Sequence, residues 1–311
     1  MSYTGLRAIT NVGEPQLINE MENGLKEFFE WGLLNCYNWS NVTYGATDIH
    51  GNRMDILKPV SDDNYTDGQV WQTFRKELVY ESGLSTSTQP IGITGVTISG
   101  DVVSAGYNVD YRNGLVIFDD PIDTTATVQM EFSYKYVQVN QIEDVPWWKK
   151  VQYDSFNVGN VQWTQLTGTS AGEWDVHGQN RIQLPAIIIE ATTAGAALPY
   201  ELGDNASWIN QDINFYILAE NSFDRNNILD AIRNQHDESI FLFDSQSVRS
   251  IYPLDYNNYK VNNNLYTDLV SNTGARGIKC RLKQCIVSDI GLVVPSEIHA
   301  GVVRVTCEAI Q

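Results

Sequence analysis

The stretch that most constrains the fold runs from residue 212 to residue 244 and reads DINFYILAENSFDRNNILDAIRNQHDESIFLFD. Its first part alternates apolar and polar residues, which is typical of a β-strand with one buried face. Asn221 or Ser222 can cap the helix that follows, and Asp224 lies in the first turn, near the positive end of the helix dipole. That helix has an apolar stripe formed by Ile228, Leu229 and Ile232. Because SIFLFD then reads as another strand, we expect a strand–helix–strand unit here.

A second helix is predicted from Pro15 to about Asn35, since proline is favoured in the first turn of a helix. Apolar residues recur there at helical spacing, namely Leu17, Met21, Leu25, Phe28, Phe29, Leu33 and Cys36. The other side of the helix carries Glu20, Glu22, Lys26, Glu27 and Glu30. We therefore expect this helix to pack on a sheet through its apolar stripe.

The middle of the chain, from Thr73 to Val139, has the character of an antiparallel β-structure. Asn113-Gly114 lies between YNVDY and LVIFD, which predicts a two-residue hairpin turn. In the next run one strand face is apolar or aromatic, formed by Val128, Met130, Phe132, Tyr134 and Tyr136. The opposite face is formed by Gln129, Glu131, Ser133 and Lys135. This alternation predicts a half-buried antiparallel strand.

Two segments near the C-terminus, IKCRLKQCIV and GVVRVTCEAI, are predicted to be the closing strands of a sheet. The residues expected to face the core are Ile278, Cys280, Leu282, Val303, Val305, Cys307 and Ala309. Lys279, Arg281 and Lys283 are expected to face outward as a basic stripe. Cys280 and Cys285, five positions apart, should then lie on opposite faces and not pair directly. We expect the cysteines to be free thiols in a reducing cytoplasm.

These elements predict an α+β fold with a discontinuous domain. Residues 1–40 and 181–311 are expected to form a helix-on-sheet platform, because the first helix needs the C-terminal strands to cover its apolar stripe. Residues 41–180 are expected to form an inserted, antiparallel β-rich domain. LPAIIIEA, from Leu184, reads as a further buried strand of the platform.

The charge of the chain limits its partners. The formal net charge is -18, with 38 acidic and 20 basic residues. Nonspecific binding to nucleic acid needs a basic surface that neutralises phosphates, so the chain as a whole should repel DNA. No apolar run approaches the roughly 18 residues of a membrane-spanning helix, so we expect no membrane association.

No established catalytic or metal-binding motif is present. The four histidines (His50, His177, His236 and His299) show neither HxH nor HExxH spacing, and neither GxSxG nor a phosphate-binding loop occurs. Adjacent acids at Asp62/Asp63, Asp119/Asp120 and Glu143/Asp144 could act as glycosidase carboxylates or bind Ca²⁺, but such pairs in turns are mostly solvated. We expect no enzyme, no cofactor and no metal site.

Two sets of residues are candidates for contacts with other proteins. The basic stripe of Lys279, Arg281 and Lys283 could meet an acidic neighbour, or it could be a solvated strand face. Trp147 and Trp148, in the sequence PWWKK, could form a contact patch, because tryptophan is enriched at interface anchors. Packing of one of these tryptophans into the core is the alternative.

The segment RIQLPAIIIEA followed by AENSFDRNNILDAIRNQHDESIFLFD resembles virion proteins of tailed bacteriophages. In those families an extended LP segment leads to a unit of the pattern AEN..DR..L.D.I..Q.D..I.LFD. The middle segment NGLVIFDDPIDTTATVQMEFSYKYVQV resembles a β-module of phage neck and tail proteins. The order of elements is similar to that of tail terminator, or tail completion, proteins. The resemblance covers residues 15–35, 105–139 and 181–311, although the chain is longer than the small terminators.

The resemblance implies a tail-terminator-like fold and a structural role in the virion. Such a protein would form a ring, commonly a hexamer, that caps the tail tube and joins it to the neck or connector. Its partners would be neck, tail tube or sheath proteins, and DNA would pass through the lumen without specific binding. The chain would be assembled in the host cytoplasm into the tail or neck of the virion.

Two other functions stay open from the sequence. One is a baseplate or receptor-binding module with aromatic glycan contacts, suggested by Trp147, Trp148, Trp163 and Trp174. The other is a cell-wall hydrolase that acts through carboxylates such as Glu143 and Asp144.

Overall fold

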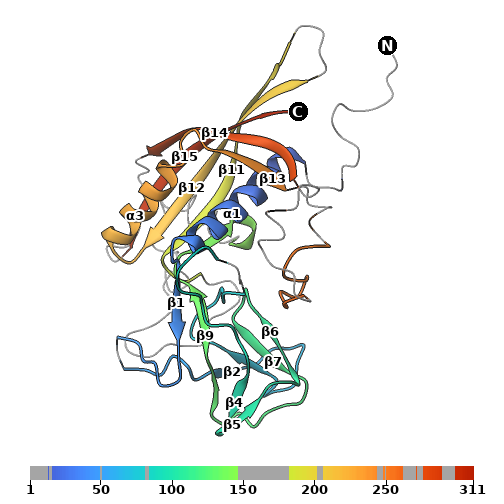
Figure 1. The fold of residues 1–311 in the computed structure, drawn as a ribbon, viewed down its shortest axis with the longest axis vertical. Coiled ribbons are helices and arrows are strands. Elements are labelled where there is room, and N and C mark those ends of the chain that lie inside the picture. The colour runs from blue at the N-terminus through green and yellow to red at the C-terminus, as the bar shows by residue number, and fades with distance from the viewer. Residues whose placement is uncertain are drawn as a thin grey trace.

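The computed structural model describes residues 13, 16–49, 51–80, 84–145, 182–201, 206–243, 248, 250–261, 271, 276–288 and 298–311. The fold is mixed α+β, with mostly antiparallel sheets, as the sequence predicts. A large sheet with its helices forms one body, and short strands form a smaller β lobe at the other end of the molecule (Figure 1). Among the described residues, no helix is long and apolar enough to cross a lipid bilayer.

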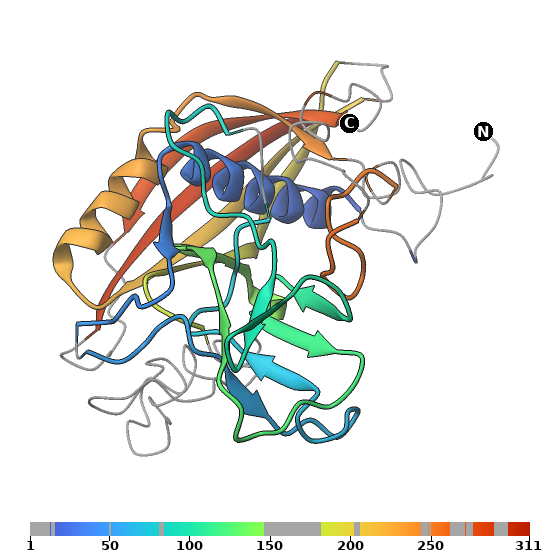
Figure 2. The ribbon, with the colours of Figure 1, turned by 60° about the horizontal axis from the view of Figure 1, so that its bottom comes forward.

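The large body is built on a sheet of six strands. In chain order these strands are β10 (Gln138–Gln141), β11 (Ala186–Pro199), β12 (Ser207–Ala219), β13 (Ser239–Phe243), β14 (Arg276–Ser288) and β15 (His299–Ile310). Their order in space is β10-β11-β12-β15-β14-β13. Neighbouring strands pair antiparallel, except β10 and β11, which are parallel. Figure 2 shows the sheet curled around a helix, so that its two edge strands lie on either side of that helix.

Both α-helices of the described chain pack on the same face of this sheet. They are α1 (Leu17–Asn35) and α3 (Ser222–Arg233). The core between the helices and the sheet contains the predicted apolar stripes, with Leu17, Met21, Leu25, Phe29, Ile228 and Ile232. Asn221 caps α3, because its side-chain oxygen accepts a hydrogen bond from the N–H of Asp224 at 2.8 Å. The strand–helix–strand unit is therefore confirmed.

Close packing of α1 on the sheet depends on one small residue. A Cβ atom at Gly24 would lie 2.9 Å from Leu242 Cδ2 and 3.3 Å from Leu242 Cα on β13. Leu242 and Leu25 are fully buried in the same core. The glycine therefore lets the helix approach the edge of the sheet.

Among the described residues, the opposite face of the sheet is covered only near the lobe. There the 3₁₀ helix η1 (Ile142–Asp144) and residues 182–184 lie over the ends of β11, β12 and β15. The buried cluster contains Ile142, Val145, Ile182, Leu184, Ala186, Ile188, Tyr216, Leu218, Ile298 and Val302.

The β lobe consists of short strands in three small sheets. Its strands are β1 (Trp39–Val42), β2 (Lys58–Val60), β3 (Val70–Gln72), β4 (Val96–Ile98), β5 (Asp101–Val103), β6 (Tyr107–Asp110), β7 (Leu115–Phe118), β8 (Val128–Met130) and β9 (Phe132–Lys135). They pair in the orders β1-β9, β2-β3-β7-β6 and β5-β4-β8. The predicted hairpin is β6–β7, in which Asp110 lies opposite Leu115; its connection therefore spans four residues rather than two.

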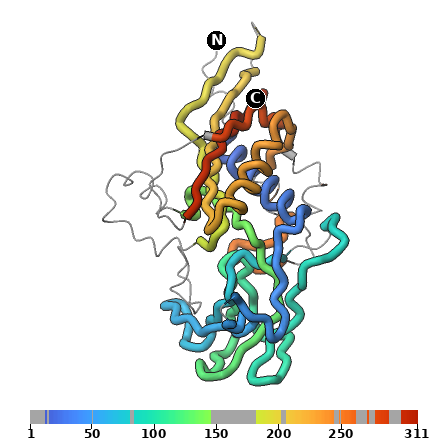
Figure 3. Tube along the Cα trace, turned by 90° about the vertical axis from the view of Figure 1, so that its left-hand side faces the viewer, coloured from blue at the N-terminus to red at the C-terminus, as the bar shows by residue number. Residues whose placement is uncertain are grey.

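Two segments belong to a different body from the one predicted for them. Residues 138–141, predicted to belong to the insertion, form the edge strand β10 of the large sheet. Tyr252 and Leu254, predicted to belong to the platform, pack in the core of the lobe, and the N–H of Tyr111 donates to Asn258 O. The two bodies thus exchange segments, because each segment finds apolar cover in the other body. Figure 3 shows the two bodies stacked along the long axis of the molecule.

The predicted single strand from Val128 to Tyr136 is two strands, β8 and β9, in different sheets. Val128, Met130 and Phe132 are fully buried, as predicted. The predicted polar face is wrong at its end, because Ser133 and Lys135 are also buried, each with 1% exposure. The reason is tertiary: the ammonium of Lys135 contacts the carboxylate of Glu30 on α1. The hydroxyl of Ser133 donates to Asn41 and accepts from the N–H of Ile91.

The expected separation of Cys280 and Cys285 is also wrong. The register of β14 against β15 shifts between Leu282 and Gln284, so that Lys283 is an extra residue. This bulge turns Cys285 toward the same core as Cys280. The prediction that the cysteines are free agrees with the structure, in which Cys36, Cys280, Cys285 and Cys307 form no disulfide.

Candidate functional site

The far end of β11 has an edge without a partner strand. β10 pairs with β11 only as far as Ile189, and within the described ranges no strand pairs with this edge further along. The N–H of Ala191 donates instead to Glu22 on α1. Residues 193–199, which we call the open edge, are all exposed and carry no charged side chain. The register against β12 shifts between Ala191 and Gly195, so the open edge begins within a bulge, and Pro199 is its last residue.

The open edge is supported by β12, which pairs with strands on both of its sides. β12 pairs with β11 as far as Pro199 opposite Ser207, and with β15 as far as Trp208 opposite Ile310. Tyr200 stacks on Trp208, with ring centroids 6.1 Å apart. Leu198, in the open edge, is 56% exposed. Apart from the bulge at its start and Pro199 at its end, the edge lacks the charged side chains that usually oppose pairing with another chain.

The basic stripe predicted on β14 lies on the exposed outer face of the sheet, but the chain neutralises most of it. Arg281 Nε donates to Asp237 Oδ1 at 2.8 Å. Lys283 Nζ donates to Glu308 Oε1 at 2.8 Å. Burial would raise the pKa of Glu308, but the hydrogen bond from Lys283 outweighs burial and holds this pKa below its usual value. Lys279 is exposed, opposite Phe241 on β13. The stripe is therefore mostly a network within the sheet.

The other predicted contact residues, Trp147 and Trp148, lie outside the described residues, as do Trp163 and Trp174. The structure thus brings together the three residues of the basic stripe and says nothing of the tryptophans.

A buried ion cluster joins α1 to the lobe, which the sequence did not reveal. The ammonium of Lys135 on β9 contacts Glu30 and lies 3.4 Å from Glu77 Oε2. It also lies 4.9 Å from the centre of the Tyr80 ring, a cation–π distance. Burial lowers the pKa of Lys135 to about 7 and raises the pKa of Glu77. These charges are desolvated because helix and lobe close over them.

A second chain of polar contacts runs beside this cluster. Arg112 Nη2 donates to Tyr252 Oη at 3.1 Å, and Tyr252 Oη donates to Glu27 Oε1 at 2.9 Å. Lys26 Nζ donates to Asp144 Oδ2 at 2.9 Å. The charged face of α1, which was expected to lie on the side away from the sheet, therefore packs in large part against the lobe and the neighbouring segments. The helical spacing of these charges was visible in the sequence, but not what would cover them.

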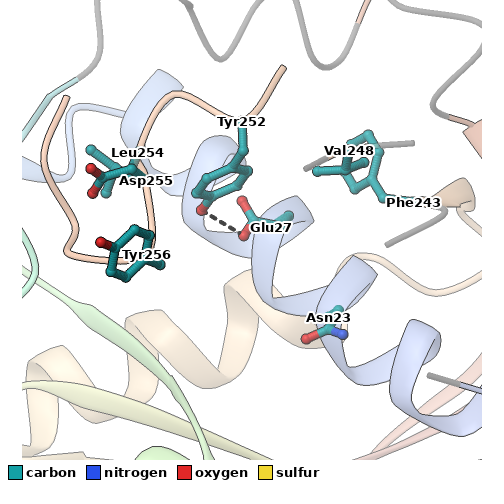
Figure 4. Close-up of a pocket in the computed structure, with 8 residues that line it drawn as sticks. All are labelled: Asn23, Glu27, Phe243, Val248, Tyr252, Leu254, Asp255 and Tyr256. Carbon is teal, nitrogen blue, oxygen red and sulfur yellow. Dashed lines mark hydrogen bonds between the residues drawn. The ribbon is translucent and has the colours of Figure 1, made fainter. Parts of the chain in front are cut away.

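A pocket of about 630 Å³ opens between α1 and the segment that contains Tyr252 (Figure 4). It is lined by Asn23, Glu27, Phe243, Val248, Tyr252, Leu254, Asp255 and Tyr256. In the close-up the Tyr252 hydroxyl points to the Glu27 carboxylate, and the dashed line marks their hydrogen bond. The only carboxylates in the described lining, those of Glu27 and Asp255, accept hydrogen bonds within the protein. Asp255 Oδ1 accepts from two backbone N–H groups of its own loop, as in a turn.

A second, more polar cavity of about 260 Å³ lies where helix, sheet and lobe meet; we call it the junction cavity. Its lining comes from α1, β10, η1, the lobe and the loop at residue 258. The lining residues are Lys26, Lys76, Glu77, Arg112, Asn113, Gln138, Asn140, Asp144, Ile182 and Asn258.

The remaining sequence candidates are scattered. Asp62 accepts from the N–H of Asn64 in a turn, and Asp119 and Asp120 are exposed. Asp144 is bound to Lys26, whereas Glu143 is exposed. His236 lies just after the end of α3. Across the part of the chain that the structure describes, no three His, Cys, Asp or Glu residues are grouped so that they could hold a metal ion.

Comparison with known proteins adds no relative: no family model matches the chain, and no curated protein is similar to it in sequence.

Proposed function

We propose that this protein is a structural virion protein of a tailed phage, a ring subunit at the head-to-tail junction that caps the tail tube and joins it to the neck or connector. The observation that carries the proposal is the open edge of β11: an exposed, uncharged strand edge on a continuous six-stranded sheet. An edge of this kind pairs with a strand of another chain by backbone hydrogen bonds.

The order of the strands supports a ring rather than a two-fold dimer. The open edge lies on one side of the sheet, and the short strand β13 forms the opposite edge. When one copy presents its open edge to the β13 side of the next copy, the contact is heterologous. Such contacts propagate and close into a ring if the rotation allows it. The resemblance to tail terminators favours a hexamer.

The rest of the molecule fits this role. The helix-on-sheet body with a β lobe at its far end offers a platform for contacts between copies and a separate lobe for other partners, which supports this role. The lobe would reach neck, tube or sheath proteins. The net charge of -18 would let DNA slide through the lumen without specific binding. Assembly would take place in the host cytoplasm, and the mature location would be the virion.

The self-assembly step is tested by the mass of the full-length protein in sedimentation and native mass measurements, with and without isolated tail tubes. We expect a closed ring, alone or on the tube end. The variant Ala196→Lys/Ala197→Lys places charges in the open edge and should remain a monomer, because edge lysines oppose strand pairing.

A control is Phe223→Lys, which adds one lysine, against two in the edge variant, at a position of α3 that is 72% exposed. It should assemble like the wild type. A wild-type protein that stays monomeric with and without tubes would contradict the proposal. So would equal assembly of the edge variant and the control.

The position in the virion needs a separate test. Gold-labelled antibody against the protein should decorate the tail end nearest the head in electron micrographs. Label on distal fibres or on the baseplate would favour the receptor-binding alternative instead.

A further inference from the structure

The junction cavity differs from the pocket beside Tyr252 in having a mainly polar lining. Its walls come from elements far apart in the chain: Lys26 on α1, Lys76 and Arg112 in the lobe, and Asn140 on β10. Convergence of polar side chains from separate elements on one small space is typical of a ligand site. A cavity of about 260 Å³ can hold a small ion or metabolite, not a polymer.

Asn140, which lines this space, has a buried amide group. The residue is 9% exposed, and among the described residues its Nδ2 has no hydrogen-bond partner. A buried donor without an acceptor costs roughly 1–3 kcal/mol, so such groups call for an explanation. An acceptor atom in the cavity would satisfy this donor.

The charges around the cavity favour an acceptor that is an anion. Three cationic side chains line it (Lys26, Lys76 and Arg112), against two carboxylates (Glu77 and Asp144). Asp144 accepts a hydrogen bond from Lys26, which can donate two more. Arg112 presents five N–H groups, one of which bonds to Tyr252. Of the amides in the lining, Asn113 already donates to Asp110 and Gln138 to Gln183. The excess positive charge, three cations against two carboxylates, therefore favours an anion.

Backbone strain is also concentrated here. Glu77 has φ +53° and Asn258 has φ +61°, and both line the cavity. Left-handed conformations of residues other than glycine are uncommon and persist where the surroundings enforce them, often at ligand sites. These two residues hold the loops that carry Lys76, Arg112 and Tyr252 against α1.

We propose that the junction cavity binds a small oxyanion, the chemistry shared by inorganic phosphate and short carboxylates. The anion accepts hydrogen bonds from the Asn140 amide and from the cationic side chains around it. Because the donors belong to α1, the sheet edge and the lobe, the bound anion fixes the lobe on the sheet. The proposal is independent of the ring function, since it requires only the monomer.

The test uses the purified full-length chain. Inorganic phosphate and succinate are titrated separately by calorimetry, against chloride at equal ionic strength. We expect saturable binding of one anion per chain and a matching rise in Tm, because a ligand that binds only the folded state stabilises it. Which of the two probes binds more tightly distinguishes a phosphate site from a carboxylate site.

The variant Asn140→Asp keeps the shape of the side chain but places a negative charge at the donor position. We expect it to bind the anion at least tenfold more weakly. The matched control, Asn257→Asp, makes the same change in an exposed loop residue and should bind like the wild type. Equal binding by Asn140→Asp and the wild type would overturn the proposal.

If Asn140→Asp does not fold, the titration of the wild-type protein alone tests the proposal. Absence of saturable heat and of any Tm change with both probes, up to about 20 mM, would overturn the proposal. Weak binding of many anions per chain, abolished by chloride, would also overturn it.

Discussion

Removal of the Lys135 ammonium should be among the most damaging single changes in this protein. The side chain is 2% exposed, and its partners Glu30 and Glu77 have side chains only 6% and 15% exposed. Lys135→Met keeps the length of the side chain but leaves two carboxylates buried without their cation. Breaking a buried ion pair in this way costs about 3–5 kcal/mol. The corresponding fall in Tm is roughly 10 °C.

The measurement is urea unfolding at pH 6, where Lys135 is protonated, followed by tryptophan fluorescence. A matched control is Lys279→Met, which removes the same group from an exposed position of β14 and should cost about 0.5 kcal/mol or less. The double variant Glu30→Gln/Lys135→Met removes both partners of the contact. It should be less destabilised than the sum of the single variants by about 1–3 kcal/mol.

The reasoning would be refuted by a loss in Lys135→Met no larger than in Lys279→Met. It would also be refuted by strict additivity in the double variant. Either result would mean that the lobe does not close over Lys135 and Glu30 in solution, and the position of the lobe against α1 would then be wrong.

Three further predictions concern pH, backbone strain and core packing. Burial lowers the pKa of Lys135 to about 7, below its unfolded value near 10.4, so the unfolded chain binds more protons than the folded chain between these pH values. The loss of stability in Lys135→Met, relative to the wild type, should therefore grow by about 2 kcal/mol between pH 7.5 and 9. A loss that stays constant with pH in unfolding curves would contradict this. Gly68→Ala should abolish folding or cost more than about 3 kcal/mol, because φ is +88° and the new Cβ would lie 2.0 Å from the carbonyl oxygen of Ile122; a near-native Tm would refute it. Leu25→Ala, at a fully buried position of α1, should cost about 2–5 kcal/mol in chemical denaturation, and Ile18→Ala, at a position 44% exposed, about 1 kcal/mol or less.

Local patterns in the sequence predicted both helices of the large body and most of its strands, but not β10 as part of this sheet or the outer half of β11. The apolar stripe of α1 and the cap of α3 obey helical spacing and capping rules that act within a few residues. The inward faces of β12 and β15 follow simple alternation, and the core contains Phe215, Val303 and Val305 as that alternation requires. These predictions succeeded because each depends on the period of one element and not on its partner.

Predictions that depended on an unbroken strand failed at irregularities. The extra residue Lys283 changes the face on which Cys285 lies, because side chains alternate with a period of two. The chain breaks between β8 and β9, so the residues predicted to form one strand form two strands in different sheets. Neither irregularity is marked by a glycine or proline in the sequence, so no local signal was available.

The candidate sites likewise include features that the sequence predicted and features that it could not predict. Lys279, Arg281 and Lys283 were found from the sequence, since outward charges on a strand are visible by alternation. Their neutralisation by Asp237 and Glu308 was not, because those partners lie 44 and 25 residues away from the lysine or arginine they bind. The open edge of β11 could not be predicted either, because the end of β10 decides where pairing stops.

The sequence by itself determined both helices of the large body, the inner half of β11 and the apolar faces of β12 and β15, because those properties follow from residue spacing along a single element. Only the tertiary structure decided that the charged face of α1 is buried against the lobe. Residues 26, 30, 135 and 144 acquire their environment from contacts that span about a hundred positions of the chain. Such contacts form only when the whole molecule closes and removes these charges from water, and no local pattern encodes that closure.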